Sequence, residues 1–235
     1  MMTRRGFLNY MTLAGTAHVL GHVRSSNAAE PAPETKGIRL SKVPSACVAP
    51  QYVAKELLRA EGFDQIEYVS AGAGGLPMAQ ALGRGQFDIG MNFAAPLVVA
   101  LDEGMPIVLL AGVHVGCFEL FTSERIRTFS DLKGKTAAIL SERSSQHIFL
   151  ASIATTIGLD PNRDIRWASH PAGEAKQLLA EGKIDAFLGF PPDSQELRAK
   201  KIGRVLLNSA IDRPWSQYFC CPIAANHEFA RKHPI

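Results

Sequence analysis

Two loops of the sequence place glycine or serine directly before a predicted helix, which is an arrangement that proteins use to hold anions. The run from Ser70 to Gly75 precedes one such helix, and Ser144 and Ser145 precede another. Glycine lets a ligand approach the free N–H groups of a helix start, where the helix dipole favours negative charge. Ordinary helix capping would explain either loop alone. Their joint placement predicts an anion held between two facing helix N-termini.

Aromatic and polar side chains near these and similar loops are candidates for selecting the ligand. In open α/β sheets, ligands bind beyond the carboxyl ends of the strands. There Phe93, Phe118 and Phe190 predict an apolar wall, with packing in the core as the alternative. Glu142 and Arg143 are candidate selectivity groups that have a surface role as their alternative. The expected ligand-binding residues are Ser45, Ser70, Gly72, Gly74, Gly75, Asn92, Phe93, Ala94, Phe118, Ser144, Ser145, Gln146, His147, Phe190 and Asp193.

Motifs for catalysis are missing from the sequence. It has no G-x-S-x-G nucleophile elbow and no phosphate-loop lysine. The glycine-rich loop does not match the dinucleotide fingerprint, because Pro77 stands where the third glycine should be. We therefore expect no reaction, no catalytic residue and no cofactor.

Histidine and cysteine spacing argues against a metal site. His114, His147, His170, His227 and His233 lack the close spacing of metal ligands, so we expect no metal. The four cysteines, Cys47, Cys117, Cys220 and Cys221, form no C-x-x-C pair and are too few for a disulfide scaffold. We expect buried free thiols. A bridge from Cys117 to Cys220 or Cys221 in an oxidising compartment is the alternative.

Charge distribution excludes two classes of partner. The formal net charge of +3 comes from Arg4, Arg5 and Arg24, because the first 29 residues contain no Asp or Glu. Of the 25 basic residues, 22 remain without these three, against 22 acidic residues. Nucleic acids and anionic membrane surfaces need a concentrated excess of Lys and Arg. We expect neither partner.

The N-terminus has the order of an export signal. The segment Thr3-Arg4-Arg5-Gly6-Phe7-Leu8 is followed by a weakly apolar run and then by small residues up to Ala29. This order resembles a bacterial twin-arginine signal, and the apolar run is shorter than the ~20 residues of a membrane span. We expect residues 1–29 to be a signal cleaved near Ala28 or Ala29, and a periplasmic protein. A frayed basic N-terminus is the alternative.

The mature chain alternates predicted strands and helices. A linker at 30–36 leads to strands at 38–43, 66–70, 87–92 and 107–112, with helices at 50–60, 77–84 and 96–103 between them. A second unit has strands at 136–140, 165–168, 184–189 and 205–207, with helices at 145–157 and 173–180. Such alternation calls for parallel α/β sheets. A chain of 235 residues is long enough for two lobes with a crevice between them.

An internal echo supports two related lobes. Residues 82–93 and 179–190 share Leu, Gly, Asp and Phe at identical offsets. In each, a helix end and a glycine stop precede a buried strand. The alternative is that any helix-to-strand junction favours Gly and Asp.

Several of these segments, in this order, resemble a known family. Residues 38–43, the 72–75 loop, Gly-Gln-Phe-Asp-Ile-Gly at 85–90, Ser-Asp-Leu-Lys-Gly-Lys at 130–135 and Gly-Lys-Ile-Asp-Ala at 182–186 resemble periplasmic solute-binding proteins of ABC importers. The pattern most resembles the nitrate, sulfonate and taurine branch, which is similar to thiamine-pyrimidine precursor binders. The resemblance covers about residues 38–229.

This resemblance implies a type II two-lobed α/β fold that closes on its ligand by hinge motion. Lobe 1 would span residues 30–118 and lobe 2 residues 119–217, with a return hinge strand and the start of a further lobe 1 segment at 218–235. Hinges would lie near 114–122 and 218–224. A membrane permease is the implied partner of a monomer. Because family members continue beyond this point, the chain is expected to be a truncated form that leaves apolar lobe 1 surface exposed.

We therefore expect a periplasmic binding protein for a small, anionic solute such as nitrate, a sulfonate, taurine or a related organic acid. One alternative is an enzyme similar to pyrimidine-precursor synthases, whose cysteine-rich motif would be reduced here to Cys220-Cys221. Another alternative is a sensor that binds the same ligand and signals to a membrane partner. Relatives that look alike bind different solutes, so the pattern does not name the solute.

Overall fold

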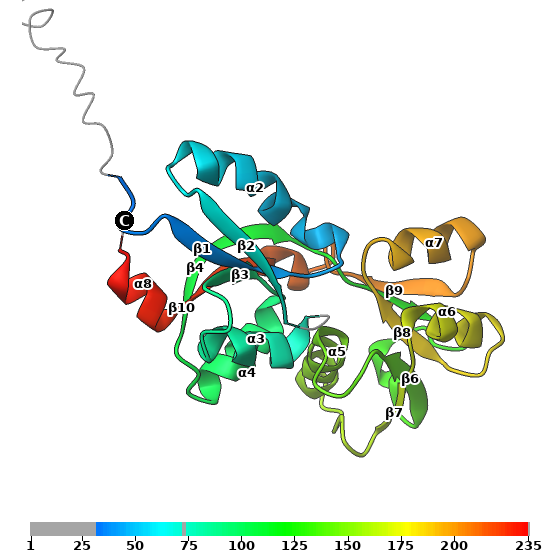
Figure 1. The fold of residues 1–235 in the computed structure, drawn as a ribbon. Coiled ribbons are helices and arrows are strands. Elements are labelled where there is room, and N and C mark those ends of the chain that lie inside the picture. Colours follow the sequence, from blue (N-terminus) through cyan, green and yellow to red (C-terminus); the bar gives the residue numbers. More distant parts are fainter. Residues whose placement is uncertain (1–31, 72–73, 235) are drawn as a thin grey trace, which may run out of the picture. The chain divides into compact units, whose positions relative to one another are not determined.

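The structure is a computed structural model that describes residues 32–71 and 74–234 (Figure 1). From Pro33 onward, the described chain forms one compact unit that contains two separate sheets. Among the residues described, no helix is both long enough and apolar enough to cross a bilayer. The expected export signal at 1–29 lies outside the described residues.

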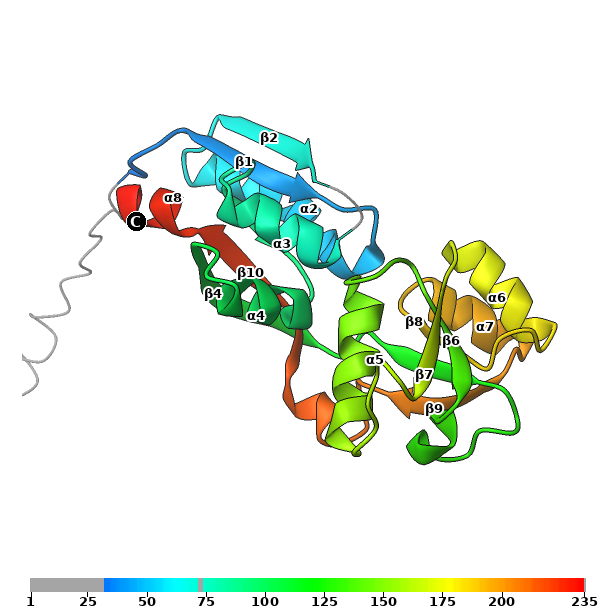
Figure 2. The same ribbon diagram turned by 90° about the horizontal axis from the view of Figure 1, so that it is seen from below.

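The first sheet has the strand order β2-β1-β3-β10-β4. Strand β1 pairs in parallel with β2 and β3, whereas β10 is antiparallel to β3 and β4. Helix α2 lies on one face of this sheet, and α3 and α4 lie on the other (Figures 1 and 2). The bounds are β1 Gly37–Lys42, η1 Ala46–Val48, α2 Ala49–Ala60, β2 Gln65–Ser70, α3 Gly75–Gly83, β3 Ile89–Met91, α4 Ala94–Asp102, β4 Ile107–Val115, β10 Phe219–Asn226 and α8 His227–Lys232.

The second sheet repeats the same pattern with the order β7-β6-β8-β5-β9. Strand β6 pairs in parallel with β7 and β8, and β5 is antiparallel to β8 and β9. We call each sheet with its helices a lobe. The bounds are β5 Glu119–Thr122, η2 Phe129–Leu132, β6 Lys135–Ile139, α5 Ser145–Thr156, β7 Ile165–Ser169, α6 Ala172–Ala180, β8 Ala186–Gly189, α7 Asp193–Lys200, β9 Arg204–Asn208 and η3 Trp215–Gln217.

The internal echo of the sequence is a repeat of local structure. In the first lobe, Asp88 accepts the Arg39 N–H at 2.7 Å, and its own N–H donates to the Arg39 carbonyl at 2.8 Å. In the second lobe, Asp185 makes the equivalent bonds with Thr136 at 3.0 and 2.9 Å. The preceding glycines adopt φ +70 and +68°, a conformation that favours glycine. The shared residues therefore perform the same task in both lobes, which is to dock a helix end and the strand after it on the first parallel strand.

The chain crosses between the lobes twice. The first crossing, residues 116–118, joins β4 to β5, and the second, residues 209–218, joins β9 to β10. Each crossing leads into the antiparallel strand of the sheet that it enters. Ser209 ties the crossings together, because its hydroxyl accepts the N–H groups of Cys117 and Phe118 at 3.1 and 2.9 Å. Both crossings lie within or beside the segments expected as hinges.

Candidate functional site

A cavity of about 180 Å³ lies where the starts of α3 and α5 meet, one from each lobe. Seven of the expected ligand-binding residues line it: Gly74, Gly75, Phe93, Ser144, Ser145, Gln146 and Phe190. Three further lining residues, Pro77, Leu140 and Ser141, were not among the expected ones. Ser141 lies in the loop that directly follows strand β6, so the rule of binding at strand ends could have included it.

The start of α3 depends on two consecutive glycines. Gly74 has φ +99° and Gly75 has φ +78°, a region that side chains with a Cβ rarely adopt. A Cβ on Gly75 would lie 3.2 Å from the Ser144 Cα, so only glycine allows the two helix starts to approach this closely. The Leu76 N–H donates to the Arg143 carbonyl at 3.3 Å. The two loops of the anion hypothesis are therefore in direct contact.

The start of α5 brings three buried polar side chains to the cavity. Ser144 is the N-cap residue and accepts the His147 N–H through its hydroxyl at 3.4 Å. Ser145 and Gln146 are buried at 3% and 6% exposure, so their polar groups face the interior rather than bulk water. Because α5 is 12 residues long, its dipole adds a positive potential at this end. The cavity thus receives hydroxyl and amide groups together with a helix N-terminus.

Among the described residues that line the cavity, none carries a formal charge. Next to the lining residue Ser144, Arg143 pairs with Glu103, which joins the loop before α5 to the residue after α4. Glu103 also accepts a hydrogen bond from the Gln80 amide at 2.9 Å, and this bond and the Arg143 guanidinium lower the pKa of Glu103. An anion in the cavity would therefore be held by dipoles, while the charged pair lies beside it and links the lobes.

The three expected aromatic residues do gather. The ring centre of Phe93 lies 4.8 Å from that of Phe118 and 5.5 Å from that of Phe190. Phe118 also stacks on Phe149 at 5.1 Å. Phe93 and Phe118 line a second, more apolar cavity of about 370 Å³, to which Ala94 and Trp215 contribute as well. Phe93 and Phe118 line a cavity and are also buried, so they form an apolar wall and pack in the core at the same time.

Asn92 acts on its neighbours rather than facing the cavity. Its side-chain N–H donates to the Gly75 carbonyl at 3.0 Å, and its side-chain oxygen accepts the Phe93 N–H at 2.8 Å. Both ends of the amide are thus bonded to backbone groups of the lining. The structure places Asn92 as a residue that positions Gly75 and Phe93.

Other expected residues lie outside the lining of the 180 Å³ cavity. Ser45 caps η1 by accepting the Cys47 N–H at 3.3 Å, and Ser70 is exposed at the end of β2. Asp193 accepts a hydrogen bond from Lys176 at 2.8 Å, within the second lobe. Ala94 and Phe118 line the second cavity instead. Gly72 lies outside the described residues.

His147 is the third residue of α5 and is not part of the cavity lining. Its Nδ1 accepts the Arg143 N–H at 2.9 Å, and its ring packs edge-on against Trp167 at 4.6 Å. Burial lowers the pKa of His147 below its ordinary value, while the nearby Glu142 opposes this shift. The neutral His147 side chain therefore holds the loop before α5 in place by accepting the Arg143 N–H.

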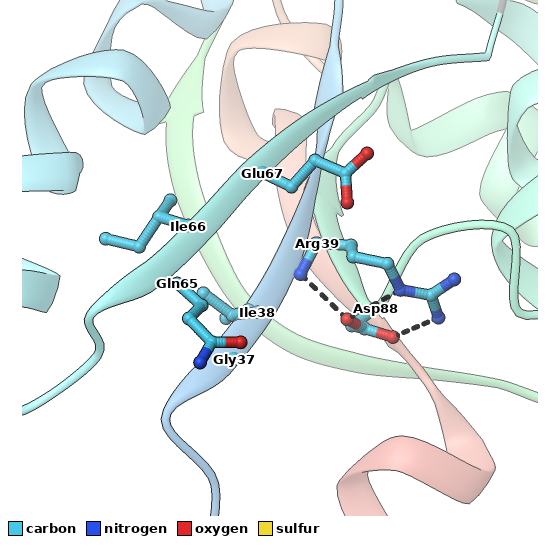
Figure 3. A pocket seen from close by; sticks show the side chains of 7 residues that line it. All are labelled: Gly37, Ile38, Arg39, Gln65, Ile66, Glu67 and Asp88. Atoms are coloured by element: carbon cyan, nitrogen blue, oxygen red, sulfur yellow. Dashed lines mark hydrogen bonds and ion pairs between the residues drawn. The ribbon is translucent and has the colours of Figure 1, made fainter.

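A different hollow, of about 470 Å³, lies at the amino ends of β1 and β2 (Figure 3). Its polar feature is the pair of Arg39 and Asp88, in which Nη2 and Nε donate to the carboxylate at 2.6 and 3.2 Å. Asp88 is the residue that docks β3 on β1, so this pair has a structural role. The hollow is also at the strand ends opposite to those where ligands bind in such sheets.

Comparisons with known proteins agree with this architecture. Residues 31–235 match the model of the NMT1-like family. No curated protein matches the chain. One similar solved structure is the alkanesulfonate-binding protein SsuA from Xanthomonas axonopodis pv. citri bound to MOPS. It has a TM-score of 0.64 and 23% identity, and the match covers 87% of this chain and 69% of that chain.

Two further solved structures have the same fold. The periplasmic aliphatic sulphonate binding protein SsuA from Escherichia coli has a TM-score of 0.64 and 21% identity, covering 84% of this chain and 64% of that chain. The periplasmic nitrate-binding protein NrtA from Synechocystis PCC 6803 has a TM-score of 0.65 and 14% identity, covering 87% and 59%. The chain therefore spans roughly two thirds or less of these proteins. The likenesses confirm the predicted two-lobed α/β fold.

Proposed function

Because this chain belongs to the NMT1-like family, we propose that it is the solute-binding component of an ABC importer and that its solute is a small anion. One observation supports an anionic solute. The starts of α3 and α5 meet at a single cavity whose lining has hydroxyl, amide and backbone N–H groups and, among the residues that the structure describes, no charged side chain. Two helix N-termini at one cavity favour a negative charge, which an acidic side chain would repel. The neighbours described as sulfonate- and nitrate-binding proteins support the same class of solute.

The aromatic residues define the second half of the proposal. Phe93 and Phe190 line the same cavity as the serines, so a solute could place its anionic group at the helix starts and an organic portion against the rings. A sulfonate or an organic acid fits this division better than a bare inorganic ion. Nitrate remains within the proposed class because the polar half of the lining would suffice for it.

Export, partner and the absence of catalysis belong to the same proposal. We place the protein in the periplasm as a monomer, delivered by the twin-arginine-type signal at 1–29 and docking on a membrane permease. No nucleic acid takes part. The lining contains no histidine, cysteine or carboxylate beside its serines, so the described site has no base to activate them as nucleophiles. Binding rather than reaction is the function that we propose.

A thermal-shift titration of the full chain tests the proposal with nitrate, taurine, alkanesulfonates and aromatic carboxylates. A ligand at about 100 times its dissociation constant should add about 2.7 kcal/mol to the free energy of unfolding. Ser145→Ala should weaken this shift, because Ser145 lines the cavity. Thr155→Ala is the matched control, since Thr155 is exposed on the same helix and bonds the Ala151 carbonyl. Equal shifts in both variants, or none with any anion, would reject the anion site.

A further inference from the structure

Two of the four cysteines, Cys117 and Cys221, meet in one cluster with His114. The Sγ atoms of Cys117 and Cys221 are 3.8 Å apart, although the residues are 104 positions apart in the sequence. Cys220 directly precedes Cys221 in the chain, and the Cys47 carbonyl lies 3.1 Å from the His114 Nε2. His114 completes the group, with its Nδ1 at 3.7 Å from the Cys117 Sγ. The spacing of histidines and cysteines along the chain gives no sign of this convergence.

Sheet pairing places these residues together. His114 on β4 and Cys221 on β10 are direct partners in the antiparallel ladder, so their side chains share one face. The register of β10 shifts between Phe219 and Cys221 and again between Cys221 and Pro222. Such bulges re-aim side chains next to functional sites. Cys117 comes from the first crossing, and Cys47 from η1.

The orientation of the His114 ring suits a metal ligand. Its Nε2 lies 3.1 Å from the Cys47 carbonyl, which can only accept a hydrogen bond. The Nδ1 contact with the Val115 carbonyl is longer, at 3.4 Å, so the ring proton belongs on Nε2. Nδ1 is then left with a lone pair near the thiols. Metal-bound histidines commonly donate their other N–H to a backbone carbonyl in this way.

We propose that His114, Cys117 and Cys221 bind a thiophilic metal ion of the zinc class as its three protein ligands. The three ligand atoms all lie within 4.8 Å of one another. Tetrahedral zinc with Zn–S near 2.3 Å and Zn–N near 2.0 Å requires S···S and S···N separations of about 3.8 and 3.5 Å. The distances of 3.8 and 3.7 Å match these requirements.

The chemistry of the donors favours this ion over other occupants. Imidazole and thiolate together select zinc or copper(I), whereas Mg²⁺ and Ca²⁺ need oxygen ligands. A disulfide would use two of the four thiols and would give no role to the lone pair of His114. Cys220 and Gly116 both line the 370 Å³ cavity, which provides a route for an ion to the cluster.

A metal ion at this cluster would join segments from both crossings between the lobes. Its ligands come from the end of β4, from the first crossing and from the start of β10, which the second crossing enters. An ion there would tie both crossings to one lobe, and the bond from His114 to the Cys47 carbonyl would link it to the loop that also contains Ser45. This site is separate from the proposed anion cavity, whose lining includes no cysteine or histidine.

Metal titration of the reduced full-length protein tests the proposal. Co²⁺ should bind one per chain and give the thiolate-to-metal absorption and the strong visible bands of a tetrahedral site, and Zn²⁺ should displace it. Cys117→Ser, Cys221→Ser and His114→Gln should each weaken Zn²⁺ binding by more than about 100-fold, since even outer-shell changes cost 10–100-fold. His170→Ala is the control, because His170 pairs with Glu174 away from the cluster. Circular dichroism separates loss of a ligand from loss of the fold.

Three outcomes would overturn the proposal. One is the absence of a Co²⁺ spectrum in the folded, reduced protein. Another is an equal Zn²⁺ affinity in Cys117→Ser and His170→Ala. The third is a Cys117–Cys221 disulfide in the isolated protein together with no metal binding after reduction. Anion binding measured by thermal shift is a separate readout, so either site can fail without the other.

Discussion

Arg143 and Glu103 form an ion pair that joins the two lobes at the edge of the anion cavity. Arg143 precedes α5 in the second lobe and has φ +60°, which is uncommon for a residue other than glycine. Glu103 follows α4 in the first lobe and also accepts the Gln80 amide. The carbonyl of Arg143 receives the Leu76 N–H as well. One residue of the second lobe therefore contacts the first lobe through both its side chain and its backbone.

Glu103→Gln should favour separation of the lobes. The pKa of Glu103 is lowered by the Gln80 hydrogen bond and by Arg143, so the ion pair is complete above the ordinary range of a glutamate. It is lost as pH falls through the lowered pKa. We expect anion affinity to fall a few-fold at low salt, with the difference vanishing at high salt because exposed charges are screened. Calorimetric titration at two salt concentrations measures this. Glu228→Gln, which breaks the pair with Lys232 in α8, should change nothing.

Gly75→Ala should abolish anion binding, whereas Gly134→Ala should not. Both glycines have positive φ, at +78 and +72°, so each substitution should cost about 1–2 kcal/mol of stability from backbone strain. A Cβ on Gly75 would meet the Ser144 backbone at 3.2 Å, whereas one on Gly134 would meet nothing within 4 Å. Urea denaturation and ligand titration separate the two effects. Retained affinity in Gly75→Ala would show that close contact of the helix starts is not needed.

Asp88→Ala should destabilise the protein more than Asp185→Ala. Both aspartates dock a strand through a backbone N–H, but Asp88 also pairs with the Arg39 guanidinium. Its loss leaves the partly buried Arg39 N–H without its acceptor and removes two bonds of the guanidinium, which keeps the Gly85 and Gln86 carbonyls. This loss should cost about 2 kcal/mol, against about 1 kcal/mol for Asp185. Denaturant midpoints of the two variants check the order. A reversed order would mean that the repeated junction is weaker in the first lobe.

Stability should fall as the pH drops below the ordinary pKa of histidine, in part because of His147. Burial lowers the pKa of this side chain, so the unfolded chain binds the proton at a higher pH than the folded protein does. The contribution is full above about pH 6.5 and is lost as pH falls toward the lowered value. Protonation also removes the lone pair that accepts the Arg143 N–H. His147→Gln should flatten the change in denaturation midpoint between pH 7.5 and 5, and an unchanged slope would contradict this.

The predictable part of the fold is the part with strong periodicity. Buried strand residues such as Ala137 and Ile139, and the glycine stops at Gly85 and Gly182, indicate the α/β alternation directly. Helix α7 cannot be predicted from periodicity, because Leu197 is its only buried apolar residue and its sequence has no apolar stripe. Strand β5 is four residues long and fully buried, which leaves no alternation to detect.

The part of the candidate site that lies at the ends of strands could be predicted from the sequence. Gly75, Ser144 and Phe190 come from different elements, but all lie at strand ends, so the rule for open sheets brings them together. The same rule also predicts Ser45 and Asp193 as ligand residues, because it does not distinguish strand-end residues that form local caps and ion pairs. The cysteine cluster depends on the register of β10 against β4, and spacing along the chain contains no information about it.

The bonds of Ser209 have a consequence for how this molecule can be engineered. Its hydroxyl accepts the N–H groups of Cys117 and Phe118, and its own N–H donates to the Phe118 carbonyl at 2.9 Å. The segment from 118 to 209 thus begins and ends at one point, as an insertion does. That segment could be exchanged for the corresponding part of another protein, with Ser209 kept so that its hydrogen bonds still join the two ends of the segment. Such a chimaera would combine half of one binding site with half of another.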